Sequence, residues 1–503
     1  MSAKDAKEDR GQRLEGFCLD RVLLSEEEAW RRGRDFLLVK RGLQKMAQWA
    51  YEASKGLFPG DPLPVGSYCE GLDCQVPGSS NDLDFLLPVR YNPLLLLESG
   101  APTQDSLLGC KEKLPTYIFR EQGLPLSRWG TKVLVDLEAF GEVYLEIHCH
   151  KQKERMEEDL ELDKLEQCQE SLSHHNLDPV QILKDLHHCV EIALDPEYTH
   201  PRQNDEVFRQ RLFPSRVPTI DHKMRESFRL EPLDLGGPAI QLAFDGGSET
   251  VPVKLVPAIK GAFILSNQWV REDLTHLSDW WDGDLSNEKS SFLRKAAVVR
   301  EVGPELVAKE GFWRLSFSHA EMMILEDVDA DGGQRQAALK LLKFVNRTRW
   351  MPEYGSILTS YHLKTILLWC CEIYPQKAQW ETILSSVQAL LRLLIHTLTK
   401  RNLPHYFLAS VNLYSRHYKS NNTIYRPLGL DALRHEAEVM LADTVRYLIP
   451  DCEPQHDGTY EETMSALGEF KEDHKEDLKE LKRMEDEHMY ESVEIAEAVA
   501  AKS

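Results

Sequence analysis

Apolar residues recur at helical spacing over several long stretches of the chain. Residues 24–55, which include Trp30 and Phe36, predict one long amphipathic helix, and residues 178–194 predict a second. The helical pattern dominates the C-terminal half, with short polar breaks between its stretches. There it predicts helices over residues 334–348, 359–374, 380–401 and 428–448.

Shorter apolar or alternating runs, typical of β-strands, occupy the first half. They cover residues 84–89, 132–140 and 142–149, and two more strands over 238–260 are joined by an Asp-Gly-Gly-Ser turn. The pattern predicts a mixed α/β (α+β) fold with a sheet-bearing lobe and a helical lobe. The expected division is an N-terminal segment at 1–23, a sheet lobe at 24–310 with a charged insertion near 151–175, a helical lobe at 311–450, and an acidic helical or disordered tail at 451–503.

Charge and cysteine usage narrow the function classes. The 503 residues carry a net charge of −22, half of it after residue 450, which disfavours binding to phosphate backbones. Double-stranded DNA is therefore not an expected partner, and RNA would need a local cluster of cations. No Cys-x-x-Cys pair or long apolar run occurs, so we expect a reduced, cytoplasmic protein without a membrane segment.

The strongest chemical signal lies between residues 65 and 90. Gly66-Ser67 offers backbone N–H groups and a hydroxyl to a phosphate, and Asp82-Leu83-Asp84 leads into an apolar strand. Strand alternation places Asp82 and Asp84 on one face, where they could share a divalent ion. This is the first half of a nucleotidyltransferase site, although a solvated turn accounts for the same pattern.

Six short segments in order resemble the cyclic GMP–AMP synthase-like (cGAS/Mab) nucleotidyltransferase family. The resemblance implies a bilobed fold, in which a mixed sheet carries the site and a helical lobe closes over two nucleotides and Mg²⁺ or Mn²⁺. The segments are GSYCEG at 66–71, NDLD at 81–84, WRLSFSH at 313–319, LKLLKF at 339–344, TSYHLKT at 359–365 and HYFLASVNLYS at 405–415.

The resemblance also implies roles for individual residues in binding ATP and GTP. Asp82 and Asp84 would hold metal, and Arg314 would contact a base edge. The remaining expected nucleotide contacts are Gly66, Ser67, Ser316, Ser318, Lys343, Ser360 and Tyr361. Without the resemblance, Arg314 could be a surface ion-pair former, and Tyr361 could be a core residue or lie at a helix start capped by Ser360.

One position departs from the pattern of active members. They carry a third carboxylate on a neighbouring strand, and the matching string VKLVPAI at 253–259 places Lys254 there. A lysine would repel a dication and pair with Asp82 or Asp84 instead. Asp136 could supply the third carboxylate if its strand were the neighbour, and Asp245 is a lesser candidate that fits a hairpin turn.

Other features bear on ligands. The stretch between His319 and Leu339 lacks cysteine, and the EIHCH string with Glu146, His148 and His150 offers no fourth ligand, so no zinc site is expected. Few apolar residues follow Gly458. We therefore expect an exposed helix over 465–499 that could contact a protein partner. Deleting the tail beyond Gly458 should leave the melting temperature nearly unchanged.

Two functions compete. The first is a catalytically impaired, nucleotide-binding member of this family, a pseudoenzyme in signalling. The second is an active enzyme that makes a cyclic dinucleotide or related second messenger from ATP and GTP in innate immune sensing. The strand that lies beside Asp84 discriminates between them: Lys254 favours the first, and Asp136 favours the second.

Overall fold

The structure is a computed structural model. It describes residues 3–54, 57–75, 82–89, 94–98, 116–121, 131–136, 142–146, 179–195, 225–234, 237, 239–247, 249–264, 302, 305–309, 312–407, 412–414, 426–452 and 458–484. The charged insertion near 151–175, His148 and His150 lie outside these residues.

The described strands form one mixed eleven-stranded sheet in the order β1-β2-β9-β10-β11-β6-β5-β4-β3, with β7 and β8 beside β9. The second half of β9 also pairs with β3. Mixed α/β architecture with a separate helical part is therefore confirmed. The strands are β1 (Leu63–Val65), β2 (Leu83–Pro88), β3 (Leu94–Glu98), β4 (Thr116–Glu121), β5 (Thr131–Asp136), β6 (Glu142–Glu146), β7 (Phe228–Leu230), β8 (Ile240–Asp245), β9 (Thr250–Ile264), β10 (Glu305–Lys309) and β11 (Phe312–Ser316).

Strands β2 and β9 run parallel at the centre of the site region. Leu83 pairs with Val253 and Phe85 with Leu255, and these four apolar side chains are buried in the main core. The intervening positions project to the opposite face, as the two-residue period of a strand requires. The predicted hairpin is confirmed, because β8 and β9 pair antiparallel across a turn that begins at Asp245.

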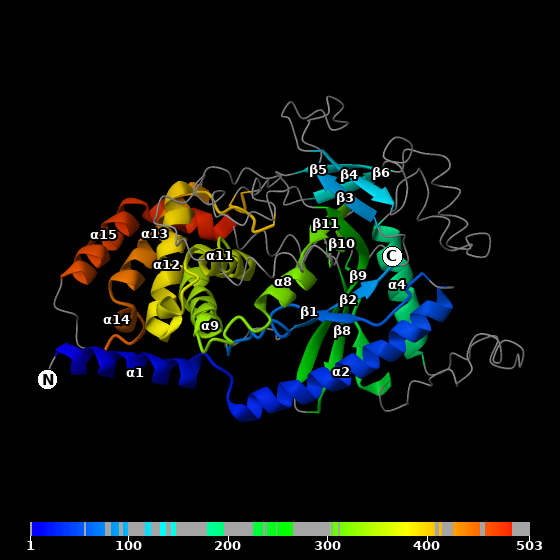
Figure 1. The fold of residues 1–503 in the computed structure, drawn as a ribbon, viewed down its shortest axis with the longest axis horizontal. Coiled ribbons are helices and arrows are strands. Elements are labelled where there is room, and N and C mark those ends of the chain that lie inside the picture. The colour runs from blue at the N-terminus through cyan, green and yellow to red at the C-terminus, as the bar shows by residue number, and fades with distance from the viewer. Residues whose placement is uncertain are drawn as a thin grey trace, which may run out of the picture.

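Two long amphipathic helices cover one face of this sheet (Figure 1). They are α2 (Glu26–Ala53) and α4 (Pro179–Leu194), which pack on each other, while α4 also contacts β7 to β10. Their buried side chains, such as Leu43 and Leu186, join the core with Phe85. Both helices were predicted from their apolar spacing.

The helical lobe begins one strand later than predicted, because Trp313 lies in β11 and the first helix starts at Ser318. Thr359 and Thr382 cap two of its helices through reciprocal capping boxes. The elements are α8 (Ser318–Leu325), α9 (Arg335–Val345), the π-helical turn η5 (Asn346–Trp350), α10 (Met351–Tyr354), α11 (Ser360–Ile373), η6 (Lys377–Trp380), α12 (Ile383–Lys400), α13 (Arg426–Ala442) and α14 (Thr444–Leu448).

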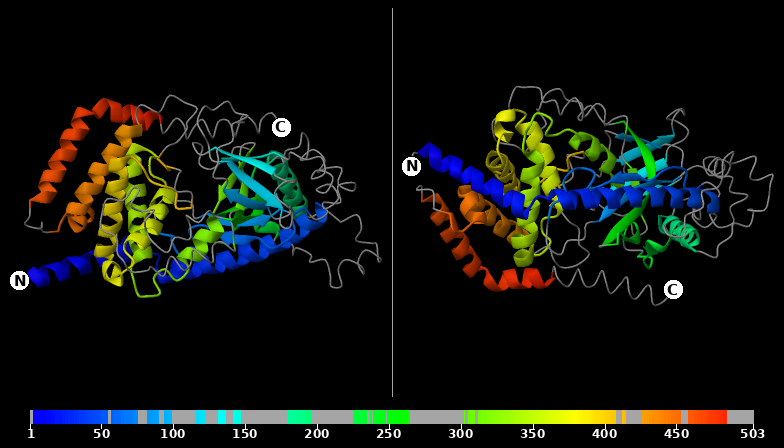
Figure 2. Two further views of the ribbon diagram at one scale, coloured as in Figure 1. Left: turned by 45° about the horizontal axis from the view of Figure 1, so that its top comes forward. Right: turned by 90° about the horizontal axis from the view of Figure 1, so that it is seen from below.

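The N-terminal segment is part of the helical lobe. Helix α1 (Ala3–Arg21) packs on α12 and α14, and Arg10 forms an ion pair with Asp443. Leu14 and Cys18 are fully buried. Figures 1 and 2 show α1 beneath the helical lobe and α2 beneath the sheet, joined end to end. Residues before 24 are therefore structural rather than a simple extension.

The C-terminal tail also packs on the body as far as residue 484. Helix α15 (Thr459–Asp473) lies against α13, and the chain continues as helix over 475–484. Leu467 and Leu481 are buried, and Leu481 sits over Gly429, where an added Cβ would lie 3.0 Å from its Cδ2. The expectation of an exposed helix is wrong for this part, because a few well-placed leucines suffice to dock it.

Because the tail docks, substitutions at its buried positions should lower the stability of the protein. Leu481→Ala should lower the free energy of unfolding by about 2–4 kcal/mol, since it removes a buried side chain and leaves a cavity. Met464, which is 41% exposed on the neighbouring helix α15, provides the control, and Met464→Ala should change the free energy of unfolding by less than about 0.5 kcal/mol. Urea unfolding measures both. Equal, small effects would mean that the tail does not dock in solution.

Among the described residues, no helix combines the length and apolar character needed to cross a bilayer.

Candidate functional site

Gly66 and Ser67 open a tight turn directly after β1. Glu70 N donates to Gly66 O at 3.0 Å, and Leu72 N donates to Ser67 O at 2.8 Å. Gly66 has φ of +83°, and an added Cβ would lie 2.7 Å from Asp84 Oδ2. Glycine is therefore needed here for two reasons, the positive φ and the close approach of the neighbouring strand.

The predicted acidic positions meet a lysine at the same place. Asp84 on β2 is paired in register with Lys254 on β9, and Lys254 Nζ forms an ion pair with Asp82 Oδ2. The ion pair expected from the sequence is therefore present. Asp136 lies elsewhere: it ends β5, pairs with Glu142 on β6, and is separated from β2 by several strands. Asp245 accepts a hydrogen bond from Gly247 N at 2.8 Å within the hairpin turn.

The electrostatics around Asp84 disfavour its charged form. Burial raises the pKa of Asp84 to about 6, and the nearby Lys254 lowers it only in part. No hydrogen bond or ion pair of its carboxylate is found within the described part of the chain. A divalent ion would need both carboxylates ionised and free, yet Asp82 is bound to an ammonium group. The donor set therefore does not fit a metal pair, and the described residues contain no cluster of three or more metal-binding side chains.

The raised pKa makes a pH-dependent prediction. A carboxyl whose pKa is about 6 when folded and near 3.8 when unfolded favours the folded state fully below about pH 4, and this contribution is lost as the pH rises through 6. Asp84→Asn should therefore be more stable than wild type at pH 8, by about 3 kcal/mol, with no such gain at pH 4. Urea unfolding at both pH values measures this. A difference that is independent of pH would contradict the burial of an ionisable Asp84.

Lys343 brings the helical lobe to the glycine-serine turn. Its Nζ donates to Ser67 Oγ at 2.9 Å and to Leu72 O at 3.0 Å. Burial lowers the pKa of Lys343. The two residues that were expected to contact phosphate thus lie in direct contact although 276 positions separate them in the chain.

The segment expected to contact a base spans the end of β11 and the start of α8. Ser316 and Ser318 hydroxyl oxygens lie 3.0 Å apart, and Ser318 N donates to Ser316 Oγ at 3.4 Å. Arg314 lies on β11 opposite Val307 of β10, and its side chain is outside the described set.

The start of α11 carries the remaining candidates. Thr359, rather than Ser360, is the N-cap, and Ser360 is the first helical residue. The hydroxyl of Tyr361 lies 2.9 Å from His405 Nε2, and Tyr361 is only partly buried, so its ring is anchored without being a core residue. Sequence reasoning did not single out His405, although it lies in the 405–415 segment.

A buried charge cluster that the sequence did not reveal links the two lobes beside Tyr361. Lys364 Nζ on α11 lies 2.9 Å from Glu70 Oε1 and also pairs with Glu321 on α8. Burial lowers the pKa of Lys364, but Glu321 and Glu70 outweigh it, so the net direction is upward. Burial raises the pKa of Glu321. Glu70, Glu321 and Lys364 each lie in or next to one of the segments that carry the family resemblance. A local sequence pattern cannot indicate a contact between residues 294 positions apart.

Two family models match this chain, and together they include only some of the site residues. Residues 141–327 match the Mab-21 protein nucleotidyltransferase domain, and residues 334–426 match the Mab-21 protein HhH/H2TH-like domain. Lys254 and Ser316 fall in the first match and Lys343 and Tyr361 in the second, whereas the 66–84 segment precedes both.

Individual relatives give the same result. The chain is 26% identical to Protein mab-21-like 3 of Danio rerio over 261 residues, 49% of this chain and 63% of that protein. It is 27% identical to Protein mab-21-like 3 of Xenopus laevis over 249 residues, 47% of this chain and 64% of that protein. Protein mab-21-like of Aedes aegypti is 30% identical over 170 residues, 32% of this chain and 44% of that protein. The matches thus span less than two thirds of each relative.

Proposed function

Because this chain belongs to the Mab-21 nucleotidyltransferase-fold family, we propose that it binds a nucleotide at the junction of its lobes without catalysing nucleotidyl transfer. One observation supports the proposal: Lys254, at the position where the resemblance predicts a third metal-binding carboxylate, is in register with Asp84 and pairs with Asp82. The output would be signalling through a bound state rather than through a synthesised messenger.

The proposed binding mode uses side chains that already lie together. Ser67 and Lys343 would contact phosphate oxygens, and the turn at Gly66 would bring backbone N–H groups close to them. Tyr361 would stack on the base, because base stacking on an aromatic ring tolerates any base. Arg314, Ser316, Ser318 and Ser360 remain proposed contacts at the edges of this site.

Lys254 would change how the phosphate charge is neutralised. In phosphoryl transfer, divalent ions hold the transferring oxygens and neutralise the developing charge. An ammonium group at that position can pair with a phosphate but cannot accept a proton from an attacking hydroxyl. The site is therefore suited to holding a nucleotide rather than activating one.

Metal independence is the direct test of this function. A fluorescent ATP or GTP analogue should bind equally, within about twofold, in EDTA and in Mg²⁺, as measured by anisotropy. Lys343→Gln should weaken binding at least about tenfold, or 1.4 kcal/mol, because it removes the phosphate-facing cation. Lys340→Gln, one turn earlier on α9, is the matched control and should stay within about twofold.

Two results would overturn the proposal. Binding that requires Mg²⁺, together with product formed from ATP and GTP, would support the active-enzyme alternative. Equal loss in both lysine variants would mean that Lys343 acts only through general charge. Double-stranded DNA is not a proposed ligand, because the net charge of −22 opposes contact with phosphate backbones. The acidic stretch near the C-terminus remains a proposed contact for a protein partner.

A further inference from the structure

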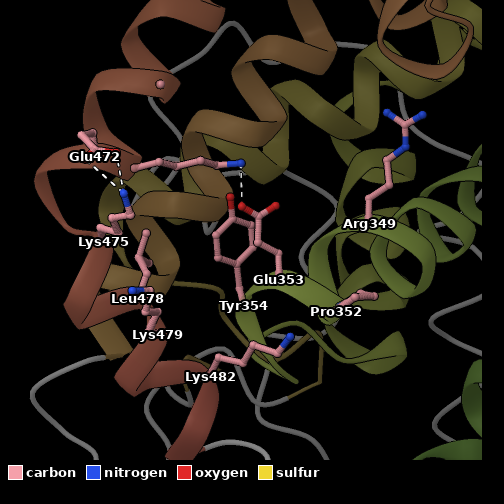
Figure 3. Close-up of a pocket in the computed structure, with 11 residues that line it drawn as sticks. Arg349, Pro352, Glu353, Tyr354, Glu472, Lys475, Leu478, Lys479 and Lys482 are labelled. Carbon is pink, nitrogen blue, oxygen red and sulfur yellow. Dashed lines mark hydrogen bonds and ion pairs between the residues drawn. The ribbon is translucent and has the colours of Figure 1, made fainter.

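A pocket of about 520 Å³ lies between α10 and the docked tail, away from the lobe junction (Figure 3). Its wall from the body includes Pro352, Glu353 and Tyr354, and its other wall is the face of α15 and of the helix at 475–484. This volume suits a small molecule.

The tail places its cations on this one side. Between Asp451 and Ser503 there are 17 acidic and 6 basic residues, yet Lys471, Lys475, Lys479 and Lys482 all line the pocket. Lys475, Lys479 and Lys482, spaced four and three residues apart, share one face of the helix over 475–484, and Lys471 reaches the pocket from the preceding α15. Arg349 adds a fifth cation, and Glu353 and Glu472 are the carboxylates in the lining. The lining is therefore positive in a chain whose net charge is −22.

The lysines differ in how firmly they are held. Lys471 lies 2.8 Å from both Glu353 and Glu436, so it neutralises the carboxylate that faces the pocket. Lys475 and Lys479 form only exposed pairs with Glu472 and Glu476, which contribute little and are easily exchanged. Within the described ranges Lys482 forms no ion pair. Figure 3 shows Lys475, Lys479 and Lys482 along one wall, with Lys482 extending towards Tyr354.

From this arrangement we infer that the pocket binds a small soluble molecule carrying two or more phosphate groups. Lys475, Lys479 and Lys482 would provide the charge, and their present pairs would exchange for the stronger phosphate contacts. Tyr354 and Leu478 would give an apolar wall for a ring or carbon frame. None of these residues belongs to the proposed nucleotide site, so the two proposals stand or fall separately.

A variant that neutralises two pocket lysines, compared with a matched control variant, tests the inference. Inorganic tripolyphosphate is titrated by calorimetry into the full chain carrying Lys343→Gln, which weakens phosphate binding at the lobe junction. We expect micromolar binding, weakened at least tenfold by adding Lys479→Gln and Lys482→Gln. The control pair, Lys377→Gln and Arg483→Gln, removes the same charge at exposed positions outside the pocket and should change the dissociation constant by less than twofold.

Each other outcome contradicts the inference. Absence of binding would show that the pocket does not hold phosphate, and equal weakening by both pairs would leave only general attraction to cations. Capture by vesicles containing a phosphoinositide, without tripolyphosphate binding, would assign the lysines to a membrane surface. Binding of an acidic peptide, without binding of tripolyphosphate, would assign these lysines to a protein partner.

Discussion

Replacing Lys254→Asp should give the site a divalent-metal affinity that the wild-type protein lacks. The substitution removes an ammonium group beside Asp84, frees the Asp82 carboxylate and adds a third acidic ligand. At an effective dielectric near 20, one charge at about 4 Å is worth roughly 4 kcal/mol, so reversing its sign is a large change. We expect Mn²⁺ affinity to rise by at least about a hundredfold.

Calorimetric titration of Mn²⁺ measures this, alongside assays of ATP and GTP turnover. Wild type should show little turnover, and Asp84→Ala should leave this low turnover nearly unchanged. Lys254→Gln is the control, because it removes the charge without adding a ligand and should give a smaller gain. Robust wild-type synthesis that Asp84→Ala abolishes would falsify the impaired-enzyme proposal and require a metal arrangement that excludes Lys254.

The second large effect should come from the buried cluster between the lobes. Lys364→Met leaves the buried carboxylates of Glu70 and Glu321 without their shared cation. Removing one partner from a buried ion pair costs about 3–5 kcal/mol of folding free energy. Adding Glu321→Gln to Lys364→Met should recover part of this loss, because only one buried charge then remains.

The loss should depend on pH in a stated direction. A carboxyl whose pKa is raised in the folded protein supports folding below its unfolded pKa, near 4.5, and loses that support as the pH rises. Lys364→Met should therefore approach wild type under acidic conditions and fall furthest below it at neutral pH. Urea unfolding from pH 4 to pH 8 measures the trend. A deficit that is constant over this range would mean that packing, rather than charge, accounts for it.

Local pattern was sufficient for the main helices, for several strands and for the pairing of Lys254 with Asp82. The spacing of Trp30 and Phe36 predicts α2, and the VKLVPAI string placed Lys254 at the position that the parallel pairing of β2 and β9 brings beside Asp84. Both depend on information within one strand or helix, plus one family pattern. Asp136 could be excluded only from the strand order, because its sequence context fits a strand beside Asp84 equally well.

Contacts between distant segments could not be predicted in the same way. Amphipathic spacing shows that a helix has an apolar face but not which surface covers it. The tail therefore looked exposed, although Leu481 docks on α13, and nothing in the local pattern indicated that Lys364 pairs with Glu70. Such pairings are specified by packing and desolvation across the chain, which a single sequence does not display.

The position of α1 has a consequence for the order of synthesis. Leu14 and Cys18 emerge from the ribosome early, but α12 and α14, which cover α1, are made some 360 or more residues later. At about 5–20 residues per second, the apolar face of α1 waits roughly 20–70 s for its partners. The helical lobe can therefore close only after α12 and α14 have been made, and a nascent chain arrested before α12 would leave this helix available to chaperones.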